Sequence, residues 1–199
     1  MTTSSMTIAR SELIVGGQKS GKSSRAEQLA ADWSLSDPQH EVMMIATAQA
    51  WDAEMKVRIE KHRIMRQQKL PRCQTIEETI EITQVIEQYS DPKRFLLIDC
   101  LTLWLSNYLS PPPEQNNVSS SELAASFLQA HSALLTAIHT CKGPIVLVSN
   151  EIGQGVIPLG AETRNFVDQL GLLNQAVAQA CERVTLMVAG YPIYIKGTA

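Results

Sequence analysis

The chain has 199 residues, of which 44% are hydrophobic; this suits one domain with a full core and excludes disorder throughout the chain. Its 17 basic and 20 acidic residues give a net charge of −3, which argues against nucleic acid or an anionic membrane as a partner. No stretch approaches the ~20 apolar residues of a membrane span, and the first ten residues lack the apolar run of a signal peptide. We therefore expect a cytoplasmic protein without a membrane span.

Short apolar runs alternate with longer segments of helical character. Strands are predicted at residues 12–15, 41–46, 95–98, 144–148 and 184–188. Helices are predicted at residues 23–33, 52–68, 77–89, 101–109, 122–141 and 163–181. The apolar runs are continuous, which is typical of strands covered on both faces in a parallel sheet. The sequence therefore predicts an α/β fold with a mostly parallel sheet flanked by helices.

The two ends and one internal segment depart from this alternation. Residues 190–196 predict a turn and a final strand antiparallel to its predecessor. Residues 111–121 are rich in Pro, Asn and Ser and predict a mobile loop, after which Ser119 and Glu122 have the spacing of a capping box. We expect residues 1–10 to be a disordered extension and residues 11–199 to form a single domain.

The four cysteines are far apart, and no C-x-x-C pair or neighbouring histidine offers the spacing of a zinc site. They are Cys73, Cys100, Cys141 and Cys181. We expect free thiols in a reducing compartment rather than disulfides.

A phosphate-binding loop follows the first predicted strand. The pattern G-x-x-x-x-G-K-[ST] is matched in full by Gly16, Gly17, Gln18, Lys19, Ser20, Gly21, Lys22 and Ser23. The glycines let backbone N–H groups curl around phosphate oxygens, and the helix that follows adds its positive N-terminal end. A chance Gly-rich turn is the alternative, but the strand before it and the helix after it favour a P-loop.

A P-loop site also needs oxygen ligands for Mg²⁺. The Ser23 hydroxyl is one candidate ligand, and Asp99, which ends the strand at 95–98, is another, directly or through water. Asp99 could instead, or also, cap the helix that starts at Leu101. A second polar cluster at residues 149–151 follows the next strand and is predicted at the same edge of the sheet.

The helix predicted at 52–68 carries a histidine among cations. Arg58, His62 and Arg66 recur at every fourth residue and so share one stripe of the helix. Neighbouring cations would lower the pKa of the imidazole and offset charge on a phosphoryl or nucleotidyl group in transfer. A solvated helix with a histidine at the rim of its apolar face explains the same pattern, and the residues alone leave both interpretations open.

The chain resembles the bifunctional adenosylcobinamide kinase/adenosylcobinamide-phosphate guanylyltransferase family of cobalamin biosynthesis. The resemblance is carried by residues 16–23, 45–48, 52–55, 58–63, 75–78, 97–102 and 149–158, with Asn107, Arg164, Asp168, Gly171, Asn174 and Gln175. It covers nearly the whole chain after residue 10. It implies a RecA-like P-loop NTPase fold and a homo-oligomer, with a trimer as the suggested form.

The resemblance implies two reactions. A nucleoside triphosphate, ATP or GTP, phosphorylates adenosylcobinamide, and GMP from GTP then passes through a guanylyl-histidine to give adenosylcobinamide-GDP. It implies that His62 is the histidine and that Lys22 assists catalysis. The nucleotide contacts that it implies beyond the P-loop are Ala46, Thr47, Ala48, Arg63, Ile64, Met65, Arg66, Glu77 and Asp99.

Two alternatives use the same motifs. A plain P-loop small-molecule kinase would phosphorylate its substrate without a covalent nucleotidyl intermediate. A nucleotide-driven binding switch would hydrolyse its nucleotide slowly and would turn over no corrinoid.

Overall fold

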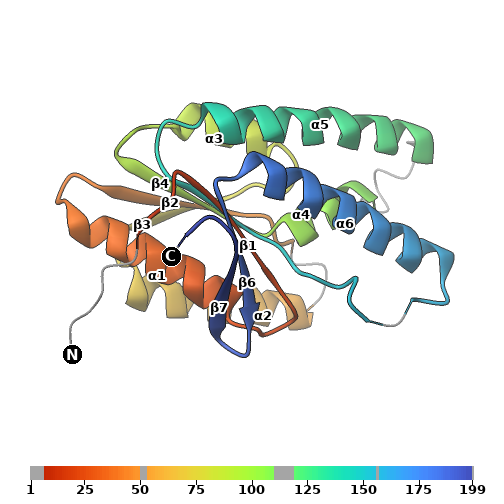
Figure 1. The fold of residues 1–199 in the computed structure, drawn as a ribbon, viewed down its shortest axis with the longest axis horizontal. Helices are drawn as coiled ribbons and strands as arrows, with labels where there is room; N and C mark the ends of the chain where they lie inside the picture. Colours follow the sequence, from red (N-terminus) through yellow and green to blue (C-terminus); the bar gives the residue numbers. More distant parts are fainter. Residues whose placement is uncertain (1–6, 50–52, 110–118, 156, 199) are drawn as a thin grey trace.

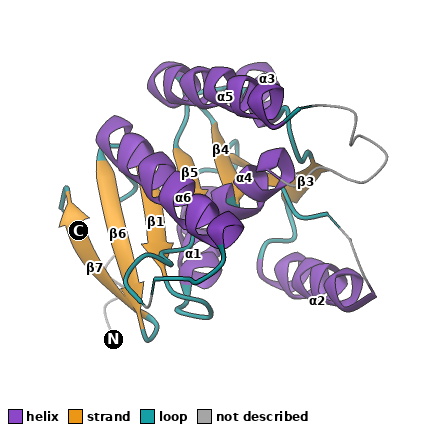
Figure 2. Ribbon diagram, turned by 90° about the vertical axis from the view of Figure 1, so that its right-hand side faces the viewer, coloured by secondary structure: helices purple, strands orange, loops and turns teal. Residues whose placement is uncertain are grey.

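In the computed structural model, which describes residues 7–49, 53–109, 119–155 and 157–198, seven strands form one sheet (Figures 1 and 2). The strands are β1 (Ser11–Gly16), β2 (Glu41–Ala46), β3 (Cys73–Glu77), β4 (Arg94–Asp99), β5 (Ile145–Val148), β6 (Arg183–Val188) and β7 (Tyr191–Lys196). Their order across the sheet is β3-β2-β4-β5-β1-β6-β7. Neighbours are parallel except β6 and β7, which form an antiparallel pair. The mostly parallel sheet and the final antiparallel strand are therefore confirmed.

Helices cover both faces of this sheet. They are α1 (Lys22–Ser36), α2 (Ala53–Lys69), α3 (Ile82–Tyr89), α4 (Leu101–Leu109), α5 (Ser120–Thr140) and α6 (Ala161–Ala180). One face lies under α3, α4, α5 and α6, and the other lies against α1, with α2 beside it (Figures 1 and 2).

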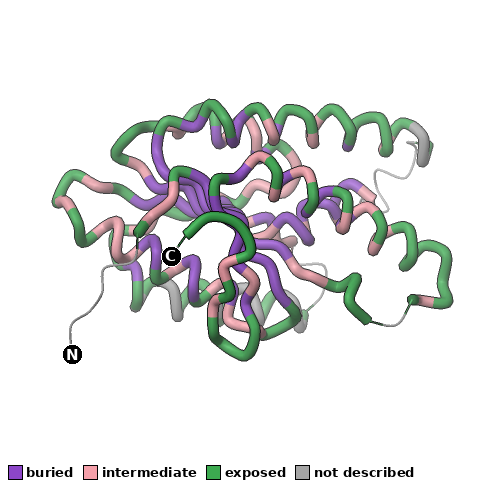
Figure 3. The backbone as a smooth tube through the Cα atoms, in the orientation of Figure 1, coloured by how far each residue is buried: buried purple, intermediate pink, exposed green. Residues whose placement is uncertain are grey.

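The continuous apolar runs are explained by cores on the two faces (Figure 3). In β4, Leu96 and Ile98 pack into the core under α3 to α6, while Phe95 and Leu97 pack against the α1 side. Since successive side chains of a strand point to opposite faces, a strand buried on both sides must be apolar at every position.

The helix predicted at residues 77–89 begins later than expected, so its predicted start is wrong. Residues Cys73–Glu77 form the edge strand β3, and α3 begins only at Ile82. The Glu78 carboxylate accepts hydrogen bonds from the backbone N–H groups of Ile80 and Glu81, 2.8 and 2.9 Å away, and so bends the chain between the two elements. The strand was missed because most of its side chains are exposed and polar, which leaves no apolar run to detect.

The other departures concern the ends of segments. Arg10 was expected in a disordered extension, but its N–H and side chain both bond the Glu182 carboxylate at 3.1 Å. Residues 1–6, and 110–118 in the expected mobile loop, lie outside the described residues. The capping box is confirmed: the Glu122 N–H donates to Ser119 Oγ, and the Ser119 N–H donates to the Glu122 carboxylate.

The four cysteines are free thiols, as expected. Among the helices that the structure describes, none is long and apolar enough to span a bilayer.

Candidate nucleotide-binding site

The carboxyl ends of the parallel strands gather the predicted site residues at one edge of the sheet. The registers pair Ala46, the last residue of β2, with Glu77 on one side and Asp99 on the other. The P-loop leaves β1 at the same edge, after Gly16. Ligands bind at this edge in open α/β sheets, so the topology places the P-loop, residues 46–48, Glu77 and Asp99 where one nucleotide can meet them.

The P-loop is a tight turn that only glycine fits at two positions. The Ser20 N–H donates to the Gly17 carbonyl at 3.2 Å and closes the turn. A Cβ on Gly16 would lie 2.6 Å from the Met187 carbonyl oxygen, so β6 passes too close for any side chain. Gly21 has φ +104°, in the left-handed region, and α1 starts directly after it.

Lys22 spans this loop from the first residue of α1. Its Nζ donates to the Gly17 carbonyl at 2.7 Å, and the side chain is largely buried. Burial lowers the pKa of Lys22, while the nearby Cys100 thiol and Asp99 carboxylate oppose that shift. The ammonium therefore lies between the loop and the end of β4, where it can balance phosphate charge.

The turn between β6 and β7 also contacts the P-loop. The Gly190 N–H donates to the Ser20 carbonyl at 2.9 Å, and a Cβ on Gly21 would lie 3.2 Å from the Gly190 Cα. The sequence does not predict this contact, because nothing in a single sequence relates residue 190 to residue 20.

The ends of β2 and β4 are tied together by one threonine. The fully buried Thr47 donates its hydroxyl to the Cys100 carbonyl at 2.7 Å and accepts from the Cys100 N–H at 2.8 Å. Its own N–H donates to the Asp99 carbonyl at 3.2 Å. The Thr47 side chain thus fixes the backbone beside Asp99.

Asn107 supports the same corner from α4. Its buried side-chain amide donates to the carbonyl oxygens of Thr47 and Thr79, at 2.9 and 3.0 Å. A buried amide in a mostly apolar helix needs such partners, and this was the available signal for its role.

The residues predicted as Mg²⁺ ligands suit that ion chemically. Asp99 ends β4 at the carboxyl edge and Ser23 lies in the first turn of α1, both partly exposed. A carboxylate and a hydroxyl are oxygen donors of the kind that Mg²⁺ prefers. The charge of Asp99 also raises the pKa of Lys22 and so opposes the effect of burial on it.

The segment after β5 joins the P-loop directly. The Glu151 N–H donates to the Gly16 carbonyl at 3.0 Å, and the Asn150 N–H donates to the Thr102 hydroxyl at 2.8 Å. The side-chain amide of Asn174, from α6, donates to the Asn150 carbonyl at 3.0 Å. The cluster predicted at residues 149–151 therefore lies next to the P-loop.

Helix α2, which carries position 62, is attached to the P-loop helix α1. Lys69, at its end, forms an ion pair with Glu27 of α1 at 2.9 Å. Arg63 forms an exposed ion pair with Glu60 at 2.9 Å. The hydrogen bond and the negative charge of Glu60 raise the pKa of Arg63, and the charge of Glu77 makes a smaller contribution in the same direction. Ile64 is exposed. The structure describes the backbone of α2, but the side chains of His62, Met65 and Arg66 lie outside its described part.

Comparison with known proteins decides the family. Residues 12–195 match the CobU family, described as cobinamide kinase / cobinamide phosphate guanyltransferase. The chain belongs to this family. The match includes part or all of each of the seven described strands and leaves out only Ser11 of β1 and Lys196 of β7.

CobU-family relatives match along nearly their whole length. The bifunctional adenosylcobalamin biosynthesis protein CobP of Pseudomonas aeruginosa is 44% identical over 94% of this chain and 97% of its own. The protein CobU of Escherichia coli, which has the same description, is 33% identical over 92% of this chain and 98% of its own.

Among solved structures, a protein from Pyrococcus horikoshii OT3 is similar with a TM-score of 0.54 and 10% identity, over 98% of this chain and 89% of the other. At that identity the likeness shows the fold alone. It agrees with the α/β architecture predicted from the sequence.

Proposed function

We propose that this chain phosphorylates adenosylcobinamide with ATP or GTP and then transfers GMP from GTP to the product, giving adenosylcobinamide-GDP. The observation that carries the proposal is the family match over residues 12–195, combined with a formed P-loop at the carboxyl edge of the sheet. In the first reaction the substrate hydroxyl oxygen bonds to the γ-phosphorus, the bridging P–O bond breaks, and the hydroxyl proton leaves.

The P-loop residues would serve that first transfer by holding the triphosphate. Lys22 and the loop N–H groups would balance the charge that develops on the phosphate oxygens. Among the described residues, the Ser20 hydroxyl is buried without a hydrogen-bond partner, so a phosphate oxygen would satisfy it. Ser23 and Asp99 would hold Mg²⁺, which, when bound, neutralises phosphate charge and orients the leaving group.

For the second reaction we propose His62 as the nucleophile. Its imidazole nitrogen would bond to the α-phosphorus of GTP while the bond to pyrophosphate breaks. A phosphate oxygen of adenosylcobinamide phosphate would then displace the histidine, so the P–N bond breaks and the diphosphate forms. The support is the attachment of α2 to α1 through Lys69 and Glu27, and the effect of Glu77 on Arg63.

Labelling with GTP that carries radioactive phosphorus at the α-position tests this step. Wild-type protein incubated with labelled GTP and Mg²⁺ should retain label after denaturing electrophoresis. The bond should be acid-labile and base-stable, as a phosphoramidate is, and His62→Ala should remove it. His139→Ala is the matched control, because His139 is an exposed histidine near the end of α5. If the protein phosphorylates adenosylcobinamide but is not labelled, it is a plain kinase. If it shows neither phosphorylation nor labelling, a nucleotide-driven binding switch is favoured.

We also propose a cytoplasmic homo-oligomer, with a trimer as the expected form. An exposed apolar face on the edge strand β7, formed by Tyr191, Ile193 and Ile195, supports association, since contiguous exposed apolar surface marks interaction sites. Free thiols agree with a reducing compartment. Light scattering coupled to size-exclusion chromatography tests the oligomer, and a monomeric mass at micromolar concentration would contradict it.

A further inference from the structure

The inner face of β7 contacts the first turn of the P-loop helix. The Arg25 guanidinium donates to the Tyr194 hydroxyl at 2.9 Å, and its central carbon lies 5.9 Å from the centre of the Tyr194 ring. The guanidinium of Arg183, on β6, lies 5.8 Å from the same centre. Cations at this distance are attracted to an aromatic face, so Tyr194 is held by two arginines.

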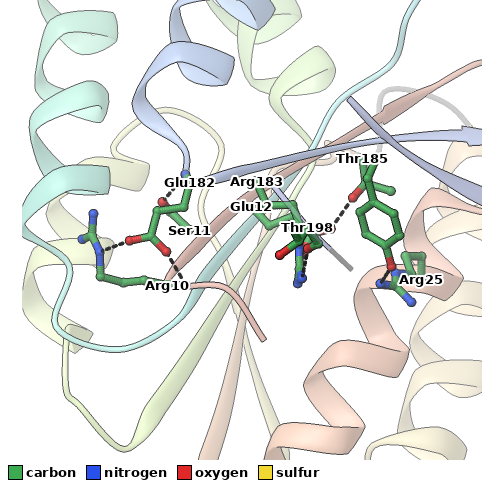
Figure 4. A network of polar contacts seen from close by, with 9 residues as sticks. Arg10, Ser11, Glu12, Arg25, Glu182, Arg183, Thr185 and Thr198 are labelled. Carbon is green, nitrogen blue, oxygen red and sulfur yellow. Dashed lines mark hydrogen bonds and ion pairs between the residues drawn. The ribbon is translucent and has the colours of Figure 1, made fainter. Parts of the chain in front are cut away.

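Arg183 is itself anchored to the P-loop strand (Figure 4). Its Nε donates to the Glu12 carboxylate at 2.8 Å, and the Thr185 hydroxyl donates to the other carboxylate oxygen at 2.6 Å. Both members of the ion pair are almost fully buried. Because Glu12 belongs to β1, the ring of Tyr194 lies between a group fixed to β1 and a group on α1.

The β6–β7 hairpin therefore reaches the P-loop at two points. At its tip, Gly190 donates to the Ser20 carbonyl at 2.9 Å. Farther along, Tyr194 holds Arg25, whose own N–H donates to the Gly21 carbonyl at 2.9 Å. These contacts fix the direction of α1 where its first N–H groups would face a phosphate.

We propose that Tyr194 is a positioning residue for the triphosphate, acting through Arg25 on the first turn of α1. The inference rests on the proposed use of the P-loop by a nucleotide. Tyr194 touches no phosphate itself; its hydroxyl fixes the helix end whose amides and Lys22 do. Removal of the hydroxyl loosens that end and weakens triphosphate binding, while the ring keeps both arginine contacts.

The test compares Tyr194→Phe with wild type by calorimetric binding of GTP and of inorganic tripolyphosphate. We expect affinity for both to fall roughly three- to ten-fold, which is the size of effect that the loss of one ordinary hydrogen bond predicts. Michaelis constants for the nucleotide should rise by the same factor in both reactions, with unchanged turnover at saturation and a melting temperature within about 2 °C of wild type. Tyr89→Phe is the matched control. The central guanidinium carbon of Arg94 lies 5.6 Å from the centre of the Tyr89 ring, but Arg94 is the first residue of β4 and so lies at the amino end of the strands, away from the P-loop.

A double-mutant cycle identifies the route. If Tyr194 acts through Arg25, then Tyr194→Phe combined with Arg25→Met loses no more affinity than Arg25→Met alone. Losses that multiply would overturn the proposal, and so would a Tyr194→Phe affinity within two-fold of wild type. Wild-type protein that binds no GTP would instead overturn the proposed function, so the two failures are distinguishable.

Discussion

The Nζ of Lys22 lies 2.7 Å from the carbonyl oxygen of Gly17. The Lys22 side chain thus connects the end of the P-loop to its beginning. We expect Lys22→Ala to lower both transfer rates by about 10²- to 10³-fold, because one preorganised cation is lost where phosphate charge develops. Steady-state kinetics of kinase and guanylyl transfer measure this. Lys142→Ala, which removes an exposed lysine near the start of β5, is the control. Unchanged kinase turnover in Lys22→Ala would place the site elsewhere.

Thr47 offers a test of the corner beside Asp99. Thr47→Val keeps the shape of the side chain but leaves the Cys100 N–H without its 2.8 Å partner, so we expect a loss of about 1–3 kcal/mol in the free energy of unfolding. The change should also raise the Mg²⁺ concentration needed for half-maximal activity. Urea unfolding and a metal titration measure the two effects. Thr136→Val is the control, because the Thr136 hydroxyl donates to the Ser132 carbonyl of its own helix; it should stay within about 0.5 kcal/mol of wild type.

The sequence predicted the carboxyl-edge residues because three properties of the chain are local. Continuous apolar runs marked β1, β2 and β4, a Gly-rich pattern marked the loop, and Asp99 came directly after an apolar run. In a parallel sheet these ends must meet at one edge.

The remaining parts of the site depend on contacts between distant residues. The bond between the Thr47 hydroxyl and the Cys100 carbonyl depends on the register of β2 on β4, which the sequence does not reveal. The contact of Gly190 with Ser20 depends on a hairpin at the far end of the chain. The strand β3 lacked an apolar run because it lies at the edge of the sheet.

The buried ion pair of Glu12 and Arg183 predicts an asymmetry between single and double variants. Arg183→Met leaves a carboxylate buried without its cation, and we expect a loss of about 3–5 kcal/mol in the free energy of unfolding. The double variant Glu12→Leu with Arg183→Met should recover part of that loss, because two apolar groups replace both charges, while the buried Thr185 hydroxyl loses its acceptor. Denaturant unfolding measures both, and a double variant less stable than Arg183→Met would refute this account.

Cys181 predicts a loss of stability at high pH. Burial raises the pKa of its thiol to about 12, against about 8.5 in an unfolded chain. Because the folded state keeps its proton longer, this stabilisation is complete below about pH 8.5 and is lost as the pH rises toward 12, by about 1.4 kcal/mol per pH unit. Urea unfolding at pH 8 and pH 10 should show a smaller decrease for Cys181→Ala than for wild type. Equal decreases would show that the thiol does not contribute.

The position of β1 within the sheet has a consequence for synthesis of the protein. Ser11 pairs with Ile145 and Glu12 pairs with Arg183, so the strand that leads into the P-loop finds both its neighbours only in the last third of the chain. Such distant pairings form slowly, since long stretches of chain must be closed first. A nascent chain that still lacks β5 and β6 therefore has the P-loop sequence but no framework to hold it, and nucleotide binding becomes a late event in folding.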